Sequence, residues 1–146
     1  MKSKNKVFLF IVLILIAING YYYILAPMYS ESSKDLEYEI AAHTLNSDSL
    51  VKAFQINEEK TSKLYVDKIV EISGTVKEIT YLNNRSTIVL ESNTDRFGVI
   101  CDVNPKQESK LKLLKKNQKI RVKGICKGFL KDVIILNCSI DLLTNE

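Results

Sequence analysis

Hydrophobic residues follow two different patterns along this chain. Residues 7–18 are twelve consecutive apolar positions, VFLFIVLILIAI. From residue 66 onward apolar and polar residues alternate instead, as expected for β-strands, whose successive side chains point to opposite faces. In the stretch IVEISGTVKEI, for example, Val70, Ile72 and Val76 share one face. The pattern therefore predicts an apolar N-terminal segment followed by a β-rich domain.

The N-terminal segment has the length of a membrane span. Val7 to Leu25 is 19 residues without a charge, and as a helix this stretch would be about 28 Å long, enough to cross a bilayer core. Three lysines precede it, and no acidic residue occurs before Glu31; the lysines are Lys2, Lys4 and Lys6. The positive-inside rule then predicts a cytoplasmic tail over residues 1–6, an anchor over 7–26 and the rest of the chain outside the cytoplasm.

Tyrosines at the far end of this segment fit the same interpretation. Tyr21, Tyr22 and Tyr23 lie where phenol rings favour the membrane interface. The alternative is a cleaved signal peptide, which also has a basic start and an apolar core. Neither Ile18 with Gly20 nor Ile24 with Ala26 supplies the pair of small residues typical of a cleavage site. Both interpretations place the domain outside the cytoplasm, in the periplasm if the organism is Gram-negative.

Residues 27–46 mix charged and polar side chains with little periodicity, and we interpret them as a linker. Two short helices are expected over residues 47–65. Ser47 and Asn57 are residues that commonly cap helix N-termini, and acidic side chains follow each of them.

Five alternating stretches and one helical stretch follow between residues 66 and 143. The strands are expected over residues 69–79, 87–92, 97–103, 119–129 and 133–143, with a helix after Pro105. Three strands, a helix and two further strands is the order of the OB-fold, a small five-stranded barrel. We therefore predict a mainly β domain of this type. Gly74 and Gly124 lie on inward-facing positions of the first and fourth strands, where a barrel needs sharp bends.

Several segments also resemble a known family. The segments YVDKIVEISGTVKEI, VICDV, LKKNQKIRVKGICKGF and VIILNCSI are similar to the tRNA_anti-like family of bacterial OB-fold proteins. The resemblance covers residues 47–142. It departs at Asn117, where the family usually has Gly; Asn also tolerates the left-handed conformation that the turn needs. The resemblance implies the fold, and it implies neither tRNA binding nor a defined biochemical role.

The three cysteines all fall on inward-facing positions. If the last two strands form a hairpin centred near Asp132, Cys126 and Cys138 lie opposite each other, within range of a disulfide. An exported domain experiences oxidising conditions that allow such a bridge. Alternatives are a Cys101–Cys138 bridge, because the fold places the third and fifth strands side by side, or three buried free thiols.

Catalysis has little support in the sequence. His43, the sole histidine, lies in the predicted linker, and no catalytic triad, phosphate-binding loop or C-x-x-C metal pair occurs. We expect a protein that is not an enzyme and has no cofactor or metal.

A binding module is the remaining class. The chain has a net charge of +4, but ten basic and five acidic residues follow residue 100, which makes the last third basic. Arg121, Lys123 and Lys127 could form a surface for an anionic ligand, although we favour a solvated strand face. The aromatic and basic candidates for single-stranded nucleic acid are Tyr81, Phe97, Phe129, Arg85 and Arg96, with the same three cations. We expect an envelope protein or other envelope partner, with nucleic acid or oligosaccharide as the alternative.

Overall fold

The computed structural model describes residues 10–21, 36–94 and 96–143. The chain divides into two compact units, residues 1–34 and 35–146. In the first unit, residues 10–21 form a helix with exposed apolar side chains. Within the described residues, none of the helices combines the length and hydropathy that a bilayer crossing requires. The predicted anchor residues Lys2, Lys4, Lys6, Val7, Tyr22, Tyr23 and Leu25 lie outside the described part of the chain.

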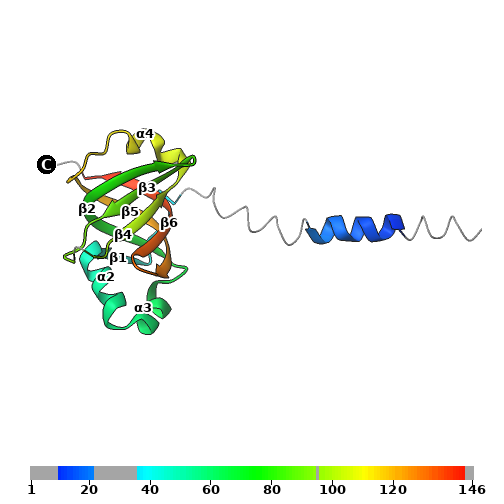
Figure 1. Cartoon of the computed structure of the whole chain (residues 1–146), viewed down its shortest axis with the longest axis horizontal. Helices are drawn as coiled ribbons and strands as arrows, with labels where there is room; N and C mark the ends of the chain where they lie inside the picture. Colours follow the sequence, from blue (N-terminus) through cyan, green and yellow to red (C-terminus); the bar gives the residue numbers. More distant parts are fainter. Residues whose placement is uncertain (1–9, 22–35, 95, 144–146) are drawn as a thin grey trace, which may run out of the picture. The chain divides into compact units, whose positions relative to one another are not determined.

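The second unit is a closed five-stranded barrel with one added strand, as Figure 1 shows. The barrel strands are β2 (Ile69–Leu82), β3 (Arg85–Leu90), β4 (Val99–Val103), β5 (Lys119–Phe129) and β6 (Val133–Leu142). β2 closes it by pairing with β5 through its first half and with β3 through its second half. The predicted OB-type order of strands is confirmed.

β6, the last strand, occupies an internal position. It runs parallel to β4 on one side and antiparallel to β5 on the other. The register of the β5–β6 hairpin shifts twice, between Lys123 and Ile125 and between Cys126 and Gly128.

Helices cover the two ends of the barrel (Figure 1). α2 (Ser47–Ile56) and α3 (Glu58–Tyr65) lie at one end, while η2 (Pro105–Gln107) and α4 (Glu108–Leu111) lie at the other. Asn57 caps α3 as predicted, accepting a hydrogen bond from the Lys60 amide at 2.9 Å. The cap of α2 is Asn46, one residue earlier than predicted, because its side chain accepts from the Ser49 amide at 2.7 Å. Ser47 becomes the first helical residue, and its hydroxyl donates to the Glu91 carbonyl.

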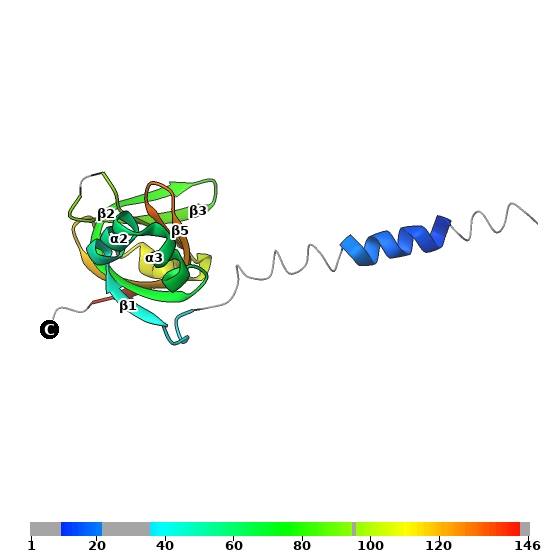
Figure 2. The ribbon, with the colours of Figure 1, turned by 90° about the horizontal axis from the view of Figure 1, so that it is seen from below.

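A short strand lies inside the segment predicted to be linker. β1 (His43–Asn46) pairs in parallel with the first half of β2 and forms the edge of the sheet (Figure 2). The prediction of a linker up to residue 46 is wrong here. Four residues are too few for an alternation signal, and this strand exists because β2 offers it an unpaired edge.

The segment before β1 also docks on the barrel. Leu36 is 2% exposed. The Glu37 carboxylate accepts hydrogen bonds from Lys110 Nζ at 2.8 Å and from Gln107 Nε2 at 3.1 Å, and Lys123 Nζ donates to the Glu37 carbonyl at 3.1 Å. We call residues 36–39 the entry strap. The chain thus enters the domain against η2 and α4.

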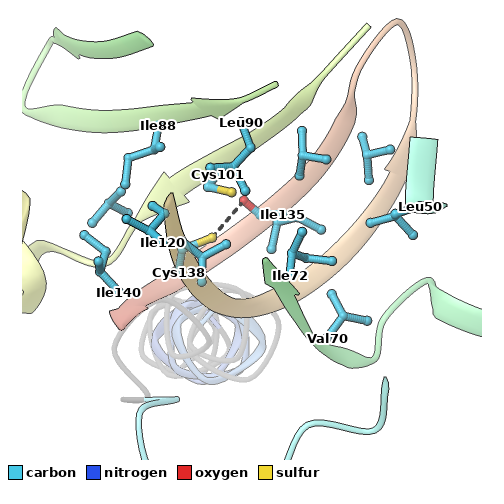
Figure 3. Packing of buried hydrophobic residues seen from close by; sticks show 14 of the residues in the cluster. Leu50, Val70, Ile72, Ile88, Leu90, Cys101, Ile120, Ile135, Cys138 and Ile140 are labelled. Carbon is cyan, nitrogen blue, oxygen red and sulfur yellow. Dashed lines mark hydrogen bonds between the residues drawn. The ribbon is translucent and has the colours of Figure 1, made fainter. Parts of the chain in front are cut away.

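Aliphatic side chains fill the barrel (Figure 3). Ile72 of β2, Ile88 of β3, Ile120 of β5 and Ile135 of β6 are fully buried in one cluster. Phe54 of α2 closes one end by stacking on Phe129, with ring centroids 5.7 Å apart. The barrel is therefore a packed core, and any ligand must bind on its outside.

Candidate binding groove

A groove lies between the β2–β3 hairpin and the η2–α4 end of the barrel. The hairpin turns at Asn83 and Asn84, both with positive φ (49° and 61°), which is the geometry of a two-residue hairpin turn. β2 continues through Leu82, past the register shift between Val76 and Glu78. Tyr81, which is 59% exposed, is carried on this extension.

The groove has a volume of about 420 Å³. Its residues come from the hairpin, from the end of β4, and from η2 and α4; they are Tyr81, Leu82, Asn83, Asn84, Arg85, Ser86, Val103, Asn104, Pro105, Glu108 and Leu111. Asn104 makes one rim rigid, because its Nδ2 donates to Asn137 Oδ1 at 2.6 Å and its Oδ1 accepts from the Lys106 amide at 2.9 Å.

The groove contains side chains that can bind a flat, polar group. The Arg85 guanidinium lies 3.4 Å from the Asp102 carboxylate, yet the Arg85 side chain remains 74% exposed. An aromatic face, a guanidinium and several amides together can stack on a flat group and donate hydrogen bonds to it. The lining residues include neither His nor Cys.

Each of the three cations on β5 that could bind an anionic ligand has a partner within the domain. Arg121 lies 3.5 Å from Glu71 and 3.8 Å from Asp141, and Lys127 lies 2.8 Å from Asp67. Lys123 is held by the entry strap through the Glu37 carbonyl. These three cations alternate along β5 as predicted, but acidic or carbonyl partners on neighbouring segments satisfy them. They do not form an unpartnered cationic surface.

The aromatic candidates separate into two groups. Phe129 contacts Phe54 and Phe97, with ring centroids 5.7 and 5.8 Å apart, and these three rings pack against the core. Tyr81 alone of the three predicted platforms lines the groove, beside Arg85. Arg96 does not line it. His43 contacts Tyr65 edge-on, with ring centroids 5.0 Å apart.

The cysteines are three buried free thiols. The register of the last hairpin places Cys126 opposite Ile135, so the pairing assumed for a Cys126–Cys138 disulfide is wrong. Cys138 instead lies opposite Val103 of β4, and its thiol donates to the Ile135 carbonyl at 3.5 Å (Figure 3). Burial raises the pKa of the Cys126 and Cys138 thiols, which keeps them protonated at neutral pH.

The two glycines lie where other chain segments approach closely. A Cβ on Gly74 would be 2.9 Å from Ser47 Oγ, and β2 changes partner from β5 to β3 directly after Thr75. A Cβ on Gly124 would be 2.5 Å from Ile135 Cγ2 and 2.9 Å from the Leu136 carbonyl.

Sequence reasoning missed three parts of this region: the groove itself, the buried Asn104 and the entry strap. The Asn83-Asn84 pair was visible as a turn signal, but nothing in the sequence shows that this turn faces α4. Glu37 pairs with Lys110, 73 positions away, and such a contact has no local signature.

Comparison with known proteins gives the family and the fold. The profile of the tRNA_anti-like family matches residues 1–140. No curated protein sequence matches the chain. Among solved structures, a provisionally assigned nucleic acid-binding lipoprotein of Klebsiella pneumoniae is similar, with a TM-score of 0.55 and 14% identity, over 66% of this chain and 89% of that one.

Two other solved structures are more distantly similar. A provisionally assigned aspartyl-tRNA synthetase of Leishmania major matches 87% of this chain but only 26% of its own, with 14% identity and a TM-score of 0.49. The S. pombe Stn1–Ten1 complex matches 53% of this chain and 59% of its own, with 11% identity and a TM-score of 0.44. At these identities the likeness concerns the fold.

Proposed function

Since the chain belongs to the tRNA_anti-like family, we propose that it is a non-catalytic binding module, held at the membrane by its N-terminal segment, whose barrel binds an envelope partner outside the cytoplasm. The family name records a fold and assigns no reaction. The proposal rests on the observation that Tyr81 and Arg85 come together in one groove on the outside of a packed barrel.

The membrane location is supported by the sequence. Residues 7–25 carry no charge, while Lys2, Lys4 and Lys6 precede them. This combination favours an anchor with a cytoplasmic N-terminus. A secreted form after cleavage remains the alternative, and it would place the barrel in the same compartment.

The groove supports binding better than the cationic face of β5 does. Its aromatic ring is exposed, its guanidinium is reachable, and its rim is held rigid by the Asn104–Asn137 hydrogen bond. A rigid rim lowers the conformational entropy that this protein itself loses on binding. The cations of β5, by contrast, already have partners.

Site-specific photo-crosslinking in intact cells tests this proposal. p-Benzoylphenylalanine would replace Tyr81 in the full chain, and Leu130, which is 90% exposed in the β5–β6 loop, would carry the same group as a control. We expect a discrete cross-linked species from position 81 and not from position 130. The substitution Arg85→Ala should lower the yield of the cross-link from position 81. The same products from both positions, or none from position 81, would contradict the proposal.

Single-stranded nucleic acid is the second candidate, because a ring beside a guanidinium is a common way to hold an unpaired base. The Klebsiella lipoprotein is described as nucleic acid-binding, but 14% identity carries the fold and not the ligand. If this candidate is right, oligo-dT binds at 50 mM salt and more weakly at 200 mM. Tyr81→Ala then removes about 1–3 kcal/mol of stacking, roughly 5- to 150-fold in affinity. Absence of binding at 50 mM salt excludes it.

A further inference from the structure

The connection between α4 and β5, together with the first residue of β5, carries exposed lysines and an exposed leucine. We call residues 112–119 the lysine loop; its exposed cations are Lys112, Lys115, Lys116 and Lys119. Leu113, in the same loop, is 65% exposed. Lys77 of β2 is close by, because the Val76 carbonyl accepts from the Asn117 amide at 2.8 Å and the Val76 amide donates to the Gln118 carbonyl at 2.9 Å.

The loop has a fixed shape that turns Leu113 outward. Leu111 and Leu114, on either side, are 1% and 8% exposed and pack into the core. A tight turn follows, in which the Gln118 amide donates to the Lys115 carbonyl at 3.2 Å and Asn117 adopts a φ of 64°. The exposed leucine is therefore held in place by its buried neighbours.

Positive charge dominates this surface. Glu108 pairs with Lys112 at 2.8 Å, but no acidic residue occurs in the sequence between Glu108 and Asp132. In the described part of the barrel, no ion pair joins Lys115, Lys116 or Lys119 to an acid. Exposed lysines next to an exposed apolar side chain are typical of segments that lie on anionic lipid.

The entry strap brings the chain into the domain beside this loop. Glu37 is bound to Lys110, two residues before the loop begins, and to Gln107. Nine residues, 27–35, separate the proposed anchor from the strap, and nine residues span at most about 32 Å. A short tether raises the effective concentration of the loop at a membrane that holds the anchor.

We propose that the lysine loop, together with its exposed Leu113, lies on the anionic lipid surface of the membrane that holds the N-terminal segment. This inference rests on the membrane anchoring proposed above. The lysines attract anionic headgroups within a Debye length, and Leu113 enters the interface once the loop is close.

The absence of Trp in the chain permits a direct test. Leu113→Trp gives the full chain a single tryptophan in the loop, and Leu130→Trp gives a control reporter at another exposed leucine, in the β5–β6 loop. Phe129, next to Leu130, stacks on Phe54 of α2, so this control lies at the end of the barrel opposite α4 (Figure 1). Both variants are reconstituted into vesicles of brominated phosphatidylcholine, either alone or mixed with phosphatidylglycerol, so that the quencher is present in both compositions.

We expect a blue shift and quenching for Leu113→Trp in phosphatidylglycerol vesicles only. Both effects should be lost at about 1 M salt, where the Debye length is about 3 Å, and after replacement of Lys112, Lys115, Lys116 and Lys119 by Gln. Leu130→Trp should respond to neither lipid. Equal responses of the two reporters, or a Leu113→Trp signal independent of phosphatidylglycerol, would overturn the inference.

Flotation of the same vesicles separates this inference from the anchoring proposal. A chain that floats with both lipids while Leu113→Trp stays unquenched retains the anchor and refutes the loop contact. Flotation with phosphatidylglycerol alone, abolished by high salt, refutes the anchor and supports the loop contact. Failure to float with either lipid refutes both.

Discussion

At the scale of single residues, Gly124 shows how closely β5 and β6 pack inside the barrel. A methyl group at this position would lie 2.5 Å from Ile135 Cγ2 and 2.9 Å from both Cys138 Sγ and the Leu136 carbonyl. Because one of these neighbours is backbone, β6 itself would have to move. We expect Gly124→Ala to lower the free energy of unfolding by about 1–3 kcal/mol, measured by urea denaturation.

Gly74→Ala is the matched control for that substitution. Its three nearest neighbours are all side-chain atoms, with the Ser47 hydroxyl at 2.9 Å and Leu90 Cβ at 3.2 Å, so no backbone has to move. The loss of stability should be smaller than for Gly124→Ala. Equal losses for the two variants would mean that the close contacts around Gly124 do not determine how much stability Gly124→Ala loses.

The thiols give a second prediction at this scale. All three are buried, and burial raises the pKa of Cys126 and Cys138. Because the thiolate is the reactive form, iodoacetamide should modify the native protein very slowly at neutral pH. In denaturant without a reductant it should modify all three. Fewer than three modified thiols would reveal a bridge, and peptide mapping should then find Cys101 with Cys138, which lie on adjacent strands.

At the scale of elements, one ionised side chain contributes to the docking of the entry strap. Hydrogen bonds from Lys110, then from Gln107, hold the pKa of Glu37 below its usual range. A lowered pKa in the docked state means that docking is favoured above the ordinary carboxyl pKa and weakens as the pH falls through the lowered value. The Leu36 methyl NMR signals should therefore shift toward their solvent-exposed positions on acidification below about pH 4.

The variant Glu37→Ala checks the cause of that shift. It should show the undocked Leu36 signals already at neutral pH and no further change on acidification. Glu58→Ala, in the first turn of α3, removes a carboxylate that does not contact the strap. If the Leu36 signals of Glu37→Ala still shift on acidification as they do in the unchanged chain, another carboxyl group is responsible for the shift.

Elements differ in how well the sequence predicts them. The bounds of β5, Lys119–Phe129, follow from alternation alone, because one face of this strand is buried along its whole length. β1 could not be predicted, since a four-residue strand depends on the edge that β2 offers. The β5–β6 register also escaped prediction, because its two shifts are set by packing around Gly124 and at Gly128, where φ is 112°.

The candidate groove was predictable only in its components. Tyr81 and Arg85 were identifiable as residue types. Alternation already places Phe97 on the inward face with Val99, but it does not show that Phe129 also packs against the core. Similarly, alternation places Arg121 and Lys123 on an outer face without showing that Glu71 and Glu37 lie across from them.

At the scale of the whole molecule, the orientation of the chain can be measured. Alkaline phosphatase is active only outside the cytoplasm, so a fusion after Glu146 should be active, whereas a green fluorescent protein fusion at the same site should be dark. Replacing Lys2, Lys4 and Lys6 by Gln should reduce the phosphatase activity, because these lysines set the orientation. A fluorescent fusion and an inactive phosphatase would place the barrel in the cytoplasm.

The internal position of β6 has a consequence for the order in which the domain is assembled. Residues 133–142 join β4 to β5, so both of those strands keep an open edge until this last strand has been synthesised. Open strand edges pair readily with other chains. A nascent chain that stalls before residue 133 would therefore expose two such edges at once. Chaperones should therefore be needed most just before residues 133–142 are synthesised. Premature termination at this stage should yield aggregates and not a partly functional barrel.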